Sequence, residues 1–251
     1  MTTASTAMAS SSFIPLVLLP GLLNDARLWR AQIDGLADVA TTQVADLTGA
    51  DSISALATAV LAAAPAPRFA LAGLSMGGYV ALEIMRQAPE RVIALALLDT
   101  SARPDTPEAT ENRRQLMNLA ETDFPAVTAK LIPKLVSPAQ QSDPVIVDLL
   151  NAMANTVGKE AFLRQQRAIM GRVDSRPHLA AIRCPTLLLC GREDVITPVE
   201  IHEELHSGIA GAQLRVIDQC GHLSTLGQPQ QVTQALREWL SGSYRSLAAE
   251  K

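Results

Sequence analysis

Short apolar runs alternate with longer stretches of mixed polarity over most of the 251-residue chain. Apolar runs with the length of interior strands lie at 16–19, 44–47, 69–74, 92–98, 185–190 and 214–217. Stretches between and after them predict helices at 26–36, 51–63, 76–87 and 230–240. Strands that are apolar on both faces, separated by helices, predict an α/β fold with a mostly parallel sheet covered by helices on both faces.

The alternation pauses in the middle of the chain. Between residues 103 and 178 no convincing strand is found, and the pattern predicts helices near 107–120, 125–136, 144–156 and 159–170. Asp143-Pro144 is a typical helix start, while Gly158 and Gly171 are typical stops. We therefore expect a helical insertion, 103–178, over a core formed by 13–102 and 179–245. The Ala, Ser and Thr-rich residues 1–12 are predicted to be a disordered tail.

The charge, the cysteine content and the hydropathy of the chain exclude several classes of protein. The net charge is −4 and no basic block is longer than a pair, which argues against nucleic acid or an anionic membrane as partner. Three cysteines without paired spacing argue against a disulfide framework. No segment is long enough to span a membrane, and the first basic residue is Arg27, so the charged start of a secretory signal is missing. We expect a cytoplasmic protein that acts on a small molecule.

One pentapeptide, Gly73-Leu74-Ser75-Met76-Gly77, joins a predicted strand directly to a predicted helix. This G-x-S-x-G pattern is typical of a nucleophile elbow, in which the serine has positive φ and larger residues in place of the glycines would collide with the neighbouring strand and helix. The turn would expose the Ser75 hydroxyl and place the Met76 N–H at a helix N-terminus, where a developing oxyanion is stabilised. The alternative is a glycine-rich turn that serves packing alone.

A serine nucleophile requires a base, usually a histidine. His222 follows the last predicted strand, in a loop at the carboxyl edge of the sheet where ligands bind, and is the predicted base. His202 and His206 are four residues apart on a polar helix, which we interpret as a solvated face rather than a metal site. No metal or organic cofactor is predicted.

The histidine in turn requires a carboxylate. Asp194 follows the strand at 185–190 and would lie at the same edge as His222, so it is the preferred candidate. Asp99, at the end of the strand at 92–98, is the second candidate. Asp218 is too near His222 in sequence to reach its ring easily. The order Ser75, Asp194, His222 is that of the α/β-hydrolases.

Four segments resemble the α/β-hydrolase superfamily, especially small bacterial esterases, lactonases and related C–C hydrolases: 19–22, 73–78, 191–198 and 221–222. The resemblance covers residues 14–242 and implies the α/β-hydrolase fold, with the insertion as a helical lid that forms the substrate pocket. It also implies that the Leu22 N–H is the second oxyanion donor. Pro20 stands where relatives often have His, and Gly227 where many have Glu.

The resemblance leaves several reactions open, because one fold hosts many. The first hypothesis is a serine hydrolase of a small carboxylic ester, lactone or thioester, acting through an acyl-enzyme. The second is C–C bond hydrolysis or elimination on the same scaffold, and the third is a non-catalytic binding module. The natural substrate and the oligomeric state stay open.

Candidate substrate-binding residues come from the first loop and the insertion: Leu23, Arg113, Met117, Arg164 and Met170. Arginines are frequent on the first and last helices of the insertion. They are interpreted either as solvated, salt-bridged faces or, for one of them, as a clamp for a substrate carboxylate.

Overall fold

A computed structural model describes the backbone of residues 13–249 and the side chains of residues 13–243, so the predicted tail 1–12 lies outside the described residues. Within that range six strands form one sheet in the order β2-β1-β3-β4-β5-β6, and all neighbours are parallel. The strands are β1 (Ile14–Leu19), β2 (Ala40–Val44), β3 (Phe69–Leu74), β4 (Val92–Leu98), β5 (Thr186–Gly191) and β6 (Gln213–Ile217). The predicted α/β class is confirmed.

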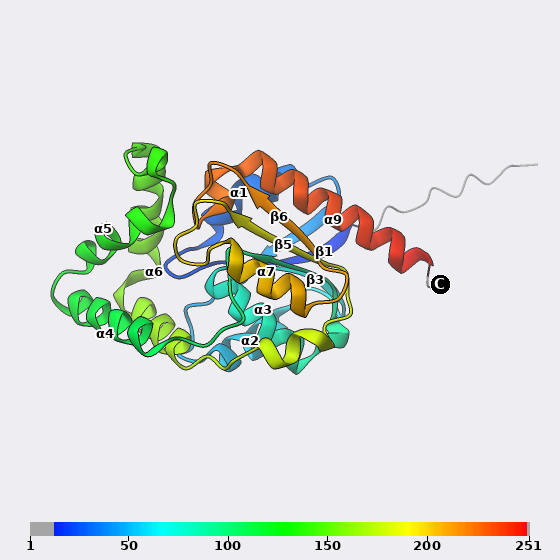
Figure 1. Cartoon of the computed structure of the whole chain (residues 1–251), viewed down its shortest axis with the longest axis horizontal. Coiled ribbons are helices and arrows are strands. Elements are labelled where there is room, and N and C mark those ends of the chain that lie inside the picture. The colour runs from blue at the N-terminus through cyan, green and yellow to red at the C-terminus, as the bar shows by residue number, and fades with distance from the viewer. Residues whose placement is uncertain (1–12, 250–251) are drawn as a thin grey trace, which may run out of the picture.

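Helices cover both faces of this sheet (Figure 1). The α-helices are α1 (Arg30–Gly35), α2 (Ile53–Ala63), α3 (Met76–Gln87), α4 (Pro107–Thr122), α5 (Phe124–Leu135), α6 (Pro144–Met170), α7 (Val199–Gly208), α8 (Ser224–Gly227) and α9 (Pro229–Ala249). The 3₁₀ helices are η1 (Ala26–Trp29), η2 (Pro89–Arg91), η3 (Pro138–Gln140) and η4 (Arg176–Ala181). Helices α1 and α9 lie on one face, and α2, α3 and α7 lie on the other.

The alternation of side chains along each strand builds two apolar cores. In β1, Leu16 and Leu18 pack with Trp29 and Leu236 of the η1, α1 and α9 side. Val17 and Leu19 point the other way and belong to the core under α2, α3 and α7. A strand buried on both faces is apolar at nearly every position, which explains the continuous runs in the sequence.

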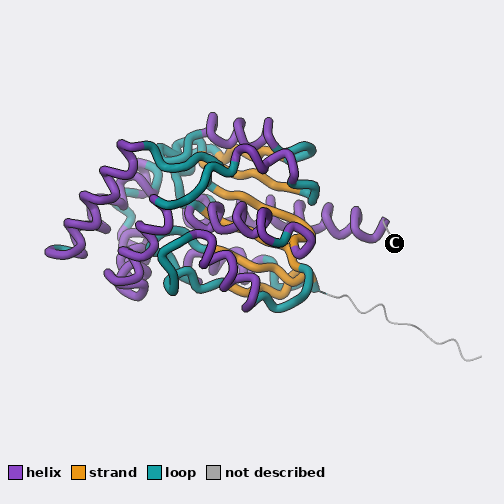
Figure 2. Tube along the Cα trace, turned by 90° about the horizontal axis from the view of Figure 1, so that it is seen from below, coloured by secondary structure: helices purple, strands orange, loops and turns teal. Residues whose placement is uncertain are grey.

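Helices α4, α5 and α6 gather beyond the carboxyl ends of the strands (Figures 1 and 2). Each begins at a capped residue followed by a proline in its first turn: Thr106, Asp123 and Asp143 accept hydrogen bonds from nearby backbone N–H groups. Helix α6 is interrupted at Gly158, where φ is +78°. The helical segments predicted for this region are therefore confirmed, including the break at Gly158.

Two predicted elements are wrong in their position or form. The strand expected at 44–47 lies at Ala40–Val44, because β2 is an edge strand with partly exposed polar residues, while the apolar Leu47 packs in the core below α2 instead. The helix expected at 26–36 is divided into η1 and α1. Among the described helices, none combines the length and apolarity that crossing a membrane requires.

Candidate active site

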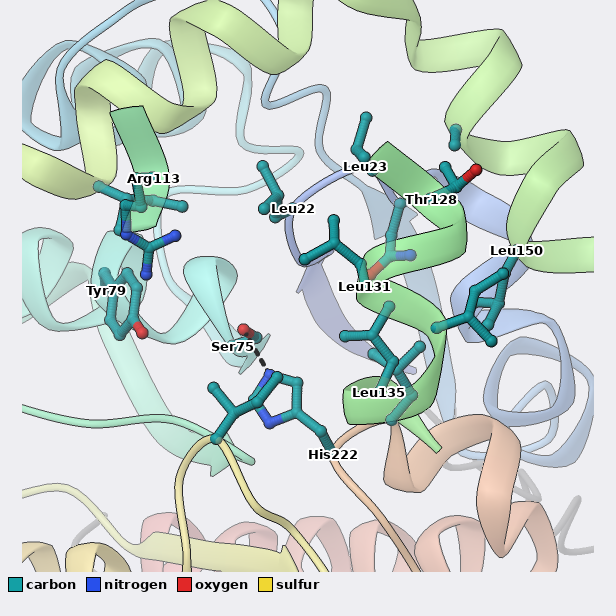
Figure 3. Close-up of a pocket in the computed structure, with 16 residues that line it drawn as sticks. Leu22, Leu23, Ser75, Tyr79, Arg113, Thr128, Leu131, Leu135, Leu150 and His222 are labelled. Atoms are coloured by element: carbon teal, nitrogen blue, oxygen red, sulfur yellow. Dashed lines mark hydrogen bonds between the residues drawn. The ribbon is translucent and has the colours of Figure 1, made fainter. Parts of the chain in front are cut away.

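The turn between β3 and α3 has the geometry of a nucleophile elbow. Ser75 has φ +54° and ψ −116°, a backbone conformation that L-residues seldom adopt. A Cβ on Gly73 would lie 2.3 Å from the Gly77 carbonyl oxygen, and one on Gly77 would lie 2.2 Å from that of Leu19. Both positions therefore require glycine, and the Ser75 side chain is presented at the carboxyl end of β3 (Figure 3).

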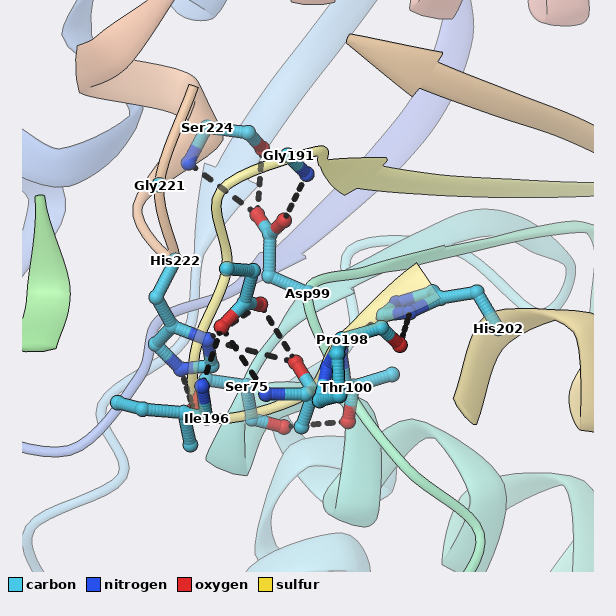
Figure 4. A network of polar contacts seen from close by, with 12 residues as sticks. Ser75, Asp99, Thr100, Gly191, Ile196, Pro198, His202, Gly221, His222 and Ser224 are labelled. Carbon is cyan, nitrogen blue, oxygen red and sulfur yellow. Dashed lines mark hydrogen bonds and ion pairs between the residues drawn. The ribbon is translucent and has the colours of Figure 1, made fainter. Parts of the chain in front are cut away.

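The structure brings Ser75, His222 and Asp194 together from three separate loops. His222 Nε2 lies 2.8 Å from Ser75 Oγ (Figures 3 and 4). His222 Nδ1 lies 2.8 Å from Asp194 Oδ2. An ionised carboxylate only accepts hydrogen bonds, so Nδ1 carries the proton and the neutral imidazole accepts the Ser75 proton at Nε2. The second oxygen of Asp194 accepts from the Ile196 and Thr197 N–H groups at 2.8 and 2.9 Å.

The buried charges act on one another in this network. Burial alone would raise the pKa of Asp194, but the charge of His222 and hydrogen bonds from His222 and Thr197 outweigh burial and hold that pKa below its ordinary value. Burial alone would lower the pKa of His222, but the charge and the hydrogen bond of Asp194 raise it above its ordinary value. The carboxylate thus stabilises a positive charge on the imidazole.

Asp99, the second candidate acid, does not contact the imidazole through any hydrogen bond of the described residues. It is fully buried, and its oxygens accept from the Gly191 N–H at 3.1 Å and from the N–H and hydroxyl of Ser224 (Figure 4). Burial, followed by the nearby charge of Asp194, raises its pKa to about 7. Asp99 therefore joins the end of β4 to the loops that carry Asp194 and His222.

His202 corrects the interpretation of its helix as a solvated face. It is fully buried on the inner side of α7, and its Nε2 accepts from the Thr100 N–H at 3.1 Å, while His206 is exposed. The Thr100 hydroxyl donates to the Ser75 carbonyl oxygen at 2.8 Å. Burial lowers the pKa of His202 to about 4, so the imidazole is neutral. It holds Thr100, which in turn contacts the backbone of the elbow. A helix this polar in sequence gives no local signal of that contact.

The loop after β1 lies against the elbow. A Cβ on Gly21 would approach the Ser75 Cβ to 3.4 Å, and among the hydrogen bonds of the described residues none uses the Leu22 or the Met76 N–H. The adjacent Leu23 N–H donates to the Gln165 side chain, whose amide donates in turn to the Leu47 carbonyl. Gln165 of α6 thereby fixes a loop in which Pro20 can donate no hydrogen bond of its own. Sequence reasoning missed this residue.

A cavity opens at Ser75 and His222 and is enclosed by helices α4, α5 and α6. Two of the candidate substrate-binding residues, Leu23 and Arg113, line it. The apolar lining includes Leu131, Leu135, Leu150, Ile132 and Ile169, and the polar lining includes Asn24, Tyr79 and Thr128.

The other three candidates do not line this cavity. Met117 is partly buried and packs against an apolar cluster formed mostly by side chains of the insertion. Arg164 donates its Nε–H to the Thr48 carbonyl oxygen at 2.8 Å, on the side of α6 that faces the loop after β2. Met170 is half-buried at the end of α6. Their helical positions were predicted well, but the face that each side chain occupies was not.

A serine on a strand–helix elbow, with histidine and aspartate on loops after later parallel strands, defines the α/β-hydrolase class of enzymes. A model described as "Alpha/beta hydrolase family" matches residues 16–235, and the chain belongs to this family. The chain is accordingly an enzyme of the α/β-hydrolase class.

Named relatives agree with this assignment. Pimeloyl-[acyl-carrier protein] methyl ester esterase of Nitrosomonas europaea is 28% identical over 86% of this chain and 91% of that protein. Biotin biosynthesis bifunctional protein BioHC of Cellvibrio japonicus is 27% identical over 93% of this chain, which spans 48% of that protein. A solved structure of a thermophilic esterase from Thermogutta terrifontis, malate bound, has a TM-score of 0.85 and 32% identity, covering 92% of this chain and 91% of that one.

Proposed function

We propose that this enzyme hydrolyses a small carboxylic ester, lactone or thioester through an acyl-enzyme formed on Ser75. The observation that carries the proposal is the unbroken chain of two 2.8 Å contacts from Ser75 Oγ through His222 to Asp194, at the inner end of a cavity. A relative named as a methyl ester esterase and a neighbour named as an esterase support the same reaction class.

The reaction follows from the positions of these groups. Ser75 Oγ attacks the substrate carbonyl carbon while its proton passes to His222 Nε2, and the tetrahedral oxyanion is bound by the Leu22 and Met76 N–H groups. Return of the electron pair expels the alcohol or thiol, which takes the proton from His222. Water then attacks the acyl-enzyme by the same route and releases the acid. No step of this mechanism requires a metal or an organic cofactor.

Asp194 acts in both halves of this cycle. It holds the tautomer in which Nε2 is free to accept a proton, and its charge stabilises the imidazolium that forms after each proton transfer. The Thr197 hydroxyl and the N–H groups of Ile196 and Thr197 fix the carboxylate in that position. The aspartate therefore stays ionised throughout.

We further propose that helices α4 to α6 act as a lid over the reacting groups. The leucine, isoleucine and alanine side chains of α5 and α6 make up more than half of the apolar residues that line the cavity, and α4 contributes Arg113. An apolar wall excludes water from the acyl-enzyme and favours burial of a substrate chain.

The activity toward simple p-nitrophenyl esters is expected to depend on acyl chain length, because the acyl chain packs against the apolar lining of the cavity. Each acyl methylene that is buried contributes up to about 0.8 kcal/mol, or roughly fourfold in kcat/KM. We expect kcat/KM to rise from acetate to about butyrate or hexanoate and to fall once the cavity is full. The measurement is kcat/KM along the acyl series, with the rate in buffer alone as the control.

Two outcomes separate the proposed function from its alternative. A rise and fall in kcat/KM along the series supports ester hydrolysis. No turnover of any chain length, while a fluorophosphonate still labels Ser75, would contradict a general esterase. Such a result would direct the search to C–C cleavage, tested by product analysis on β-diketones.

The pH dependence of kcat/KM is expected to show an acid limb with a midpoint above 6.5. Imidazolium cannot accept the Ser75 proton, and the pKa of His222 is raised above that ordinary value. The charged groups that act on the imidazole are Asp194 and Asp99, which raise its pKa, and Arg113, which lowers it. Activity is therefore present above the His222 pKa and lost as the pH falls through it. A midpoint below 6.5 contradicts the raised pKa, and a rate with no acid limb, measured where the protein stays folded, contradicts the assignment of His222 as base.

A further inference from the structure

One wall of the cavity carries a positive charge close to the reacting groups. Arg113 reaches the cavity from α4 and lies beside Tyr79, on the side of Ser75 and His222 away from Leu135 and Leu150 (Figure 3). The Ser75 hydroxyl therefore lies between this positive charge and the leucine side chains on the opposite side of the cavity.

The ion pairs around Arg113 leave this charge unbalanced. Asp105, whose side chain is 2% exposed, receives the Arg113 Nε–H at 2.8 Å on one oxygen and an Arg172 N–H on the other. Arg113 is 20% exposed and Arg172 is 9% exposed. Two guanidinium groups share one carboxylate, so one positive charge is left over beside the cavity. A partly buried charge without a counter-ion is unfavourable, and an anionic ligand would remove that cost.

Arg172 has no comparable freedom to bind a ligand. Its guanidinium lies 4.4 Å from the centre of the Tyr79 ring and donates to the carbonyl oxygens of Ile169 and Arg103 as well as to Asp105. It also does not line the cavity that contains Ser75. The surplus charge is therefore offered to the cavity by Arg113.

The Arg113 guanidinium group also offers a hydrogen-bond donor that is not used within the described part of the chain. Arg113 uses Nε for Asp105 and Nη1 for the Gln166 side-chain oxygen at 3.0 Å, and no hydrogen bond within the described part of the chain uses Nη2. Gln166 is fully buried, and its amide nitrogen has no hydrogen-bond partner among those residues either. Gln166 does not line the cavity, but the Arg113 Nη2 group is available to a ligand there, and carboxylate oxygens are the acceptors that guanidinium binds best.

We propose that Arg113 binds a free carboxylate of the substrate, so that the natural substrate is an ester, lactone or thioester bearing a second, anionic group. The scissile carbonyl lies at Ser75, the carboxylate at Arg113, and the remaining apolar part of the molecule against Leu135 and Leu150. The inference rests on the proposed ester hydrolysis at Ser75 and names its substrate class. Arg113 is then a specificity-determining residue rather than a residue of the reaction chemistry.

Matched ester pairs test this class. One set pairs the monomethyl esters of succinate, glutarate and adipate with methyl esters of monocarboxylic acids of equal carbon number. The other set places the carboxylate on the alcohol side, as in 4-acetoxybutanoate against butyl acetate. For at least one pair we expect kcat/KM to be about 10- to 100-fold higher for the anionic member, the range for a hydrogen bond to a charged group.

Substitutions of Arg113 test whether this side chain causes the preference for anionic esters. Arg113→Met should bring the anionic-to-neutral ratio of kcat/KM to about one, and Arg113→Lys should keep part of it because the charge is retained. Asp105 keeps Arg172 as its partner in both, so the fold is expected to persist. Arg114→Met is the matched control, since Arg114 lies on the same helix, is 63% exposed and pairs with Glu111 outside the cavity. It should leave the wild-type ratio unchanged.

The possible outcomes distinguish a failure of the carboxylate site at Arg113 from a failure of the proposed ester hydrolysis at Ser75. The carboxylate site is overturned if the enzyme hydrolyses both members of every pair with equal kcat/KM. It is also overturned if Arg113→Met keeps the wild-type ratio of anionic to neutral kcat/KM. Either result leaves the proposed ester hydrolysis at Ser75 intact. No hydrolysis of either member of any pair, whether or not a fluorophosphonate labels Ser75, overturns the proposed ester hydrolysis itself. A preference that Arg113→Met removes and Arg114→Met keeps supports the carboxylate site.

Discussion

Replacing Ser75 by alanine is expected to lower kcat for p-nitrophenyl butyrate by about 10⁶-fold, the cost of removing the nucleophile in other serine hydrolases. The variant keeps the cavity and the oxyanion donors but lacks the atom that forms the acyl bond. Alanine and serine both carry a Cβ, so the strain of the positive φ at this turn is similar in the two proteins and the fold should be retained. The measurement is kcat at enzyme concentrations high enough to detect the residual rate.

Ser207→Ala is the matched control for this change. Ser207 lies on the exposed side of α7, where its hydroxyl donates to the Glu203 carbonyl oxygen. Its replacement should leave kcat unchanged. A Ser75→Ala enzyme that keeps more than about a tenth of the wild-type kcat would mean that the reaction uses another nucleophile.

Changing Asp194 to asparagine is expected to lower kcat by about 10⁴-fold, as in comparable triads. The amide removes the charge that stabilises the imidazolium and favours the wrong tautomer of His222. The measurement is kcat with the same ester, alongside the unfolding midpoint of the variant, so that lost activity is distinguished from lost structure.

Asp99→Asn provides the comparison within the same network. The Asp99 carboxylate accepts from Gly191 and Ser224 and has no hydrogen bond to His222, so its loss should reduce stability more than it reduces kcat. A buried donor that meets another donor costs about 1–3 kcal/mol. If Asp194→Asn is nearly silent and Asp99→Asn is crippling, the acid has been assigned to the wrong residue.

The elbow could be predicted from the sequence because its geometry is decided within a few residues. The G-x-S-x-G pattern lies directly between a predicted strand and a predicted helix, and glycine is required at positions 73 and 77 because a Cβ there would collide with backbone oxygens. The pairing of His222 with Asp194 was also predictable, since loops at the carboxyl ends of parallel strands meet at one edge. Both inferences use local sterics and sheet topology alone.

The supporting contacts could not be predicted in this way. Gln165 holds Leu23 across 142 positions of the chain, and Asp105 pairs with Arg172 across 67. Such partners are chosen by how α4 and α6 pack, which the apolar pattern of each helix does not specify. The displaced β2 has a related cause, because an edge strand needs few apolar residues and leaves a weak signal.

Mass spectrometry of the protein after reaction with a fluorophosphonate tests covalent catalysis at Ser75 most directly. The reagent phosphonylates a serine only where a base and an oxyanion site activate it. We predict one adduct per chain in the wild type, located on the peptide that contains Ser75, and none in Ser75→Ala. An adduct on another residue, or labelling that persists in Ser75→Ala, would contradict the proposed nucleophile.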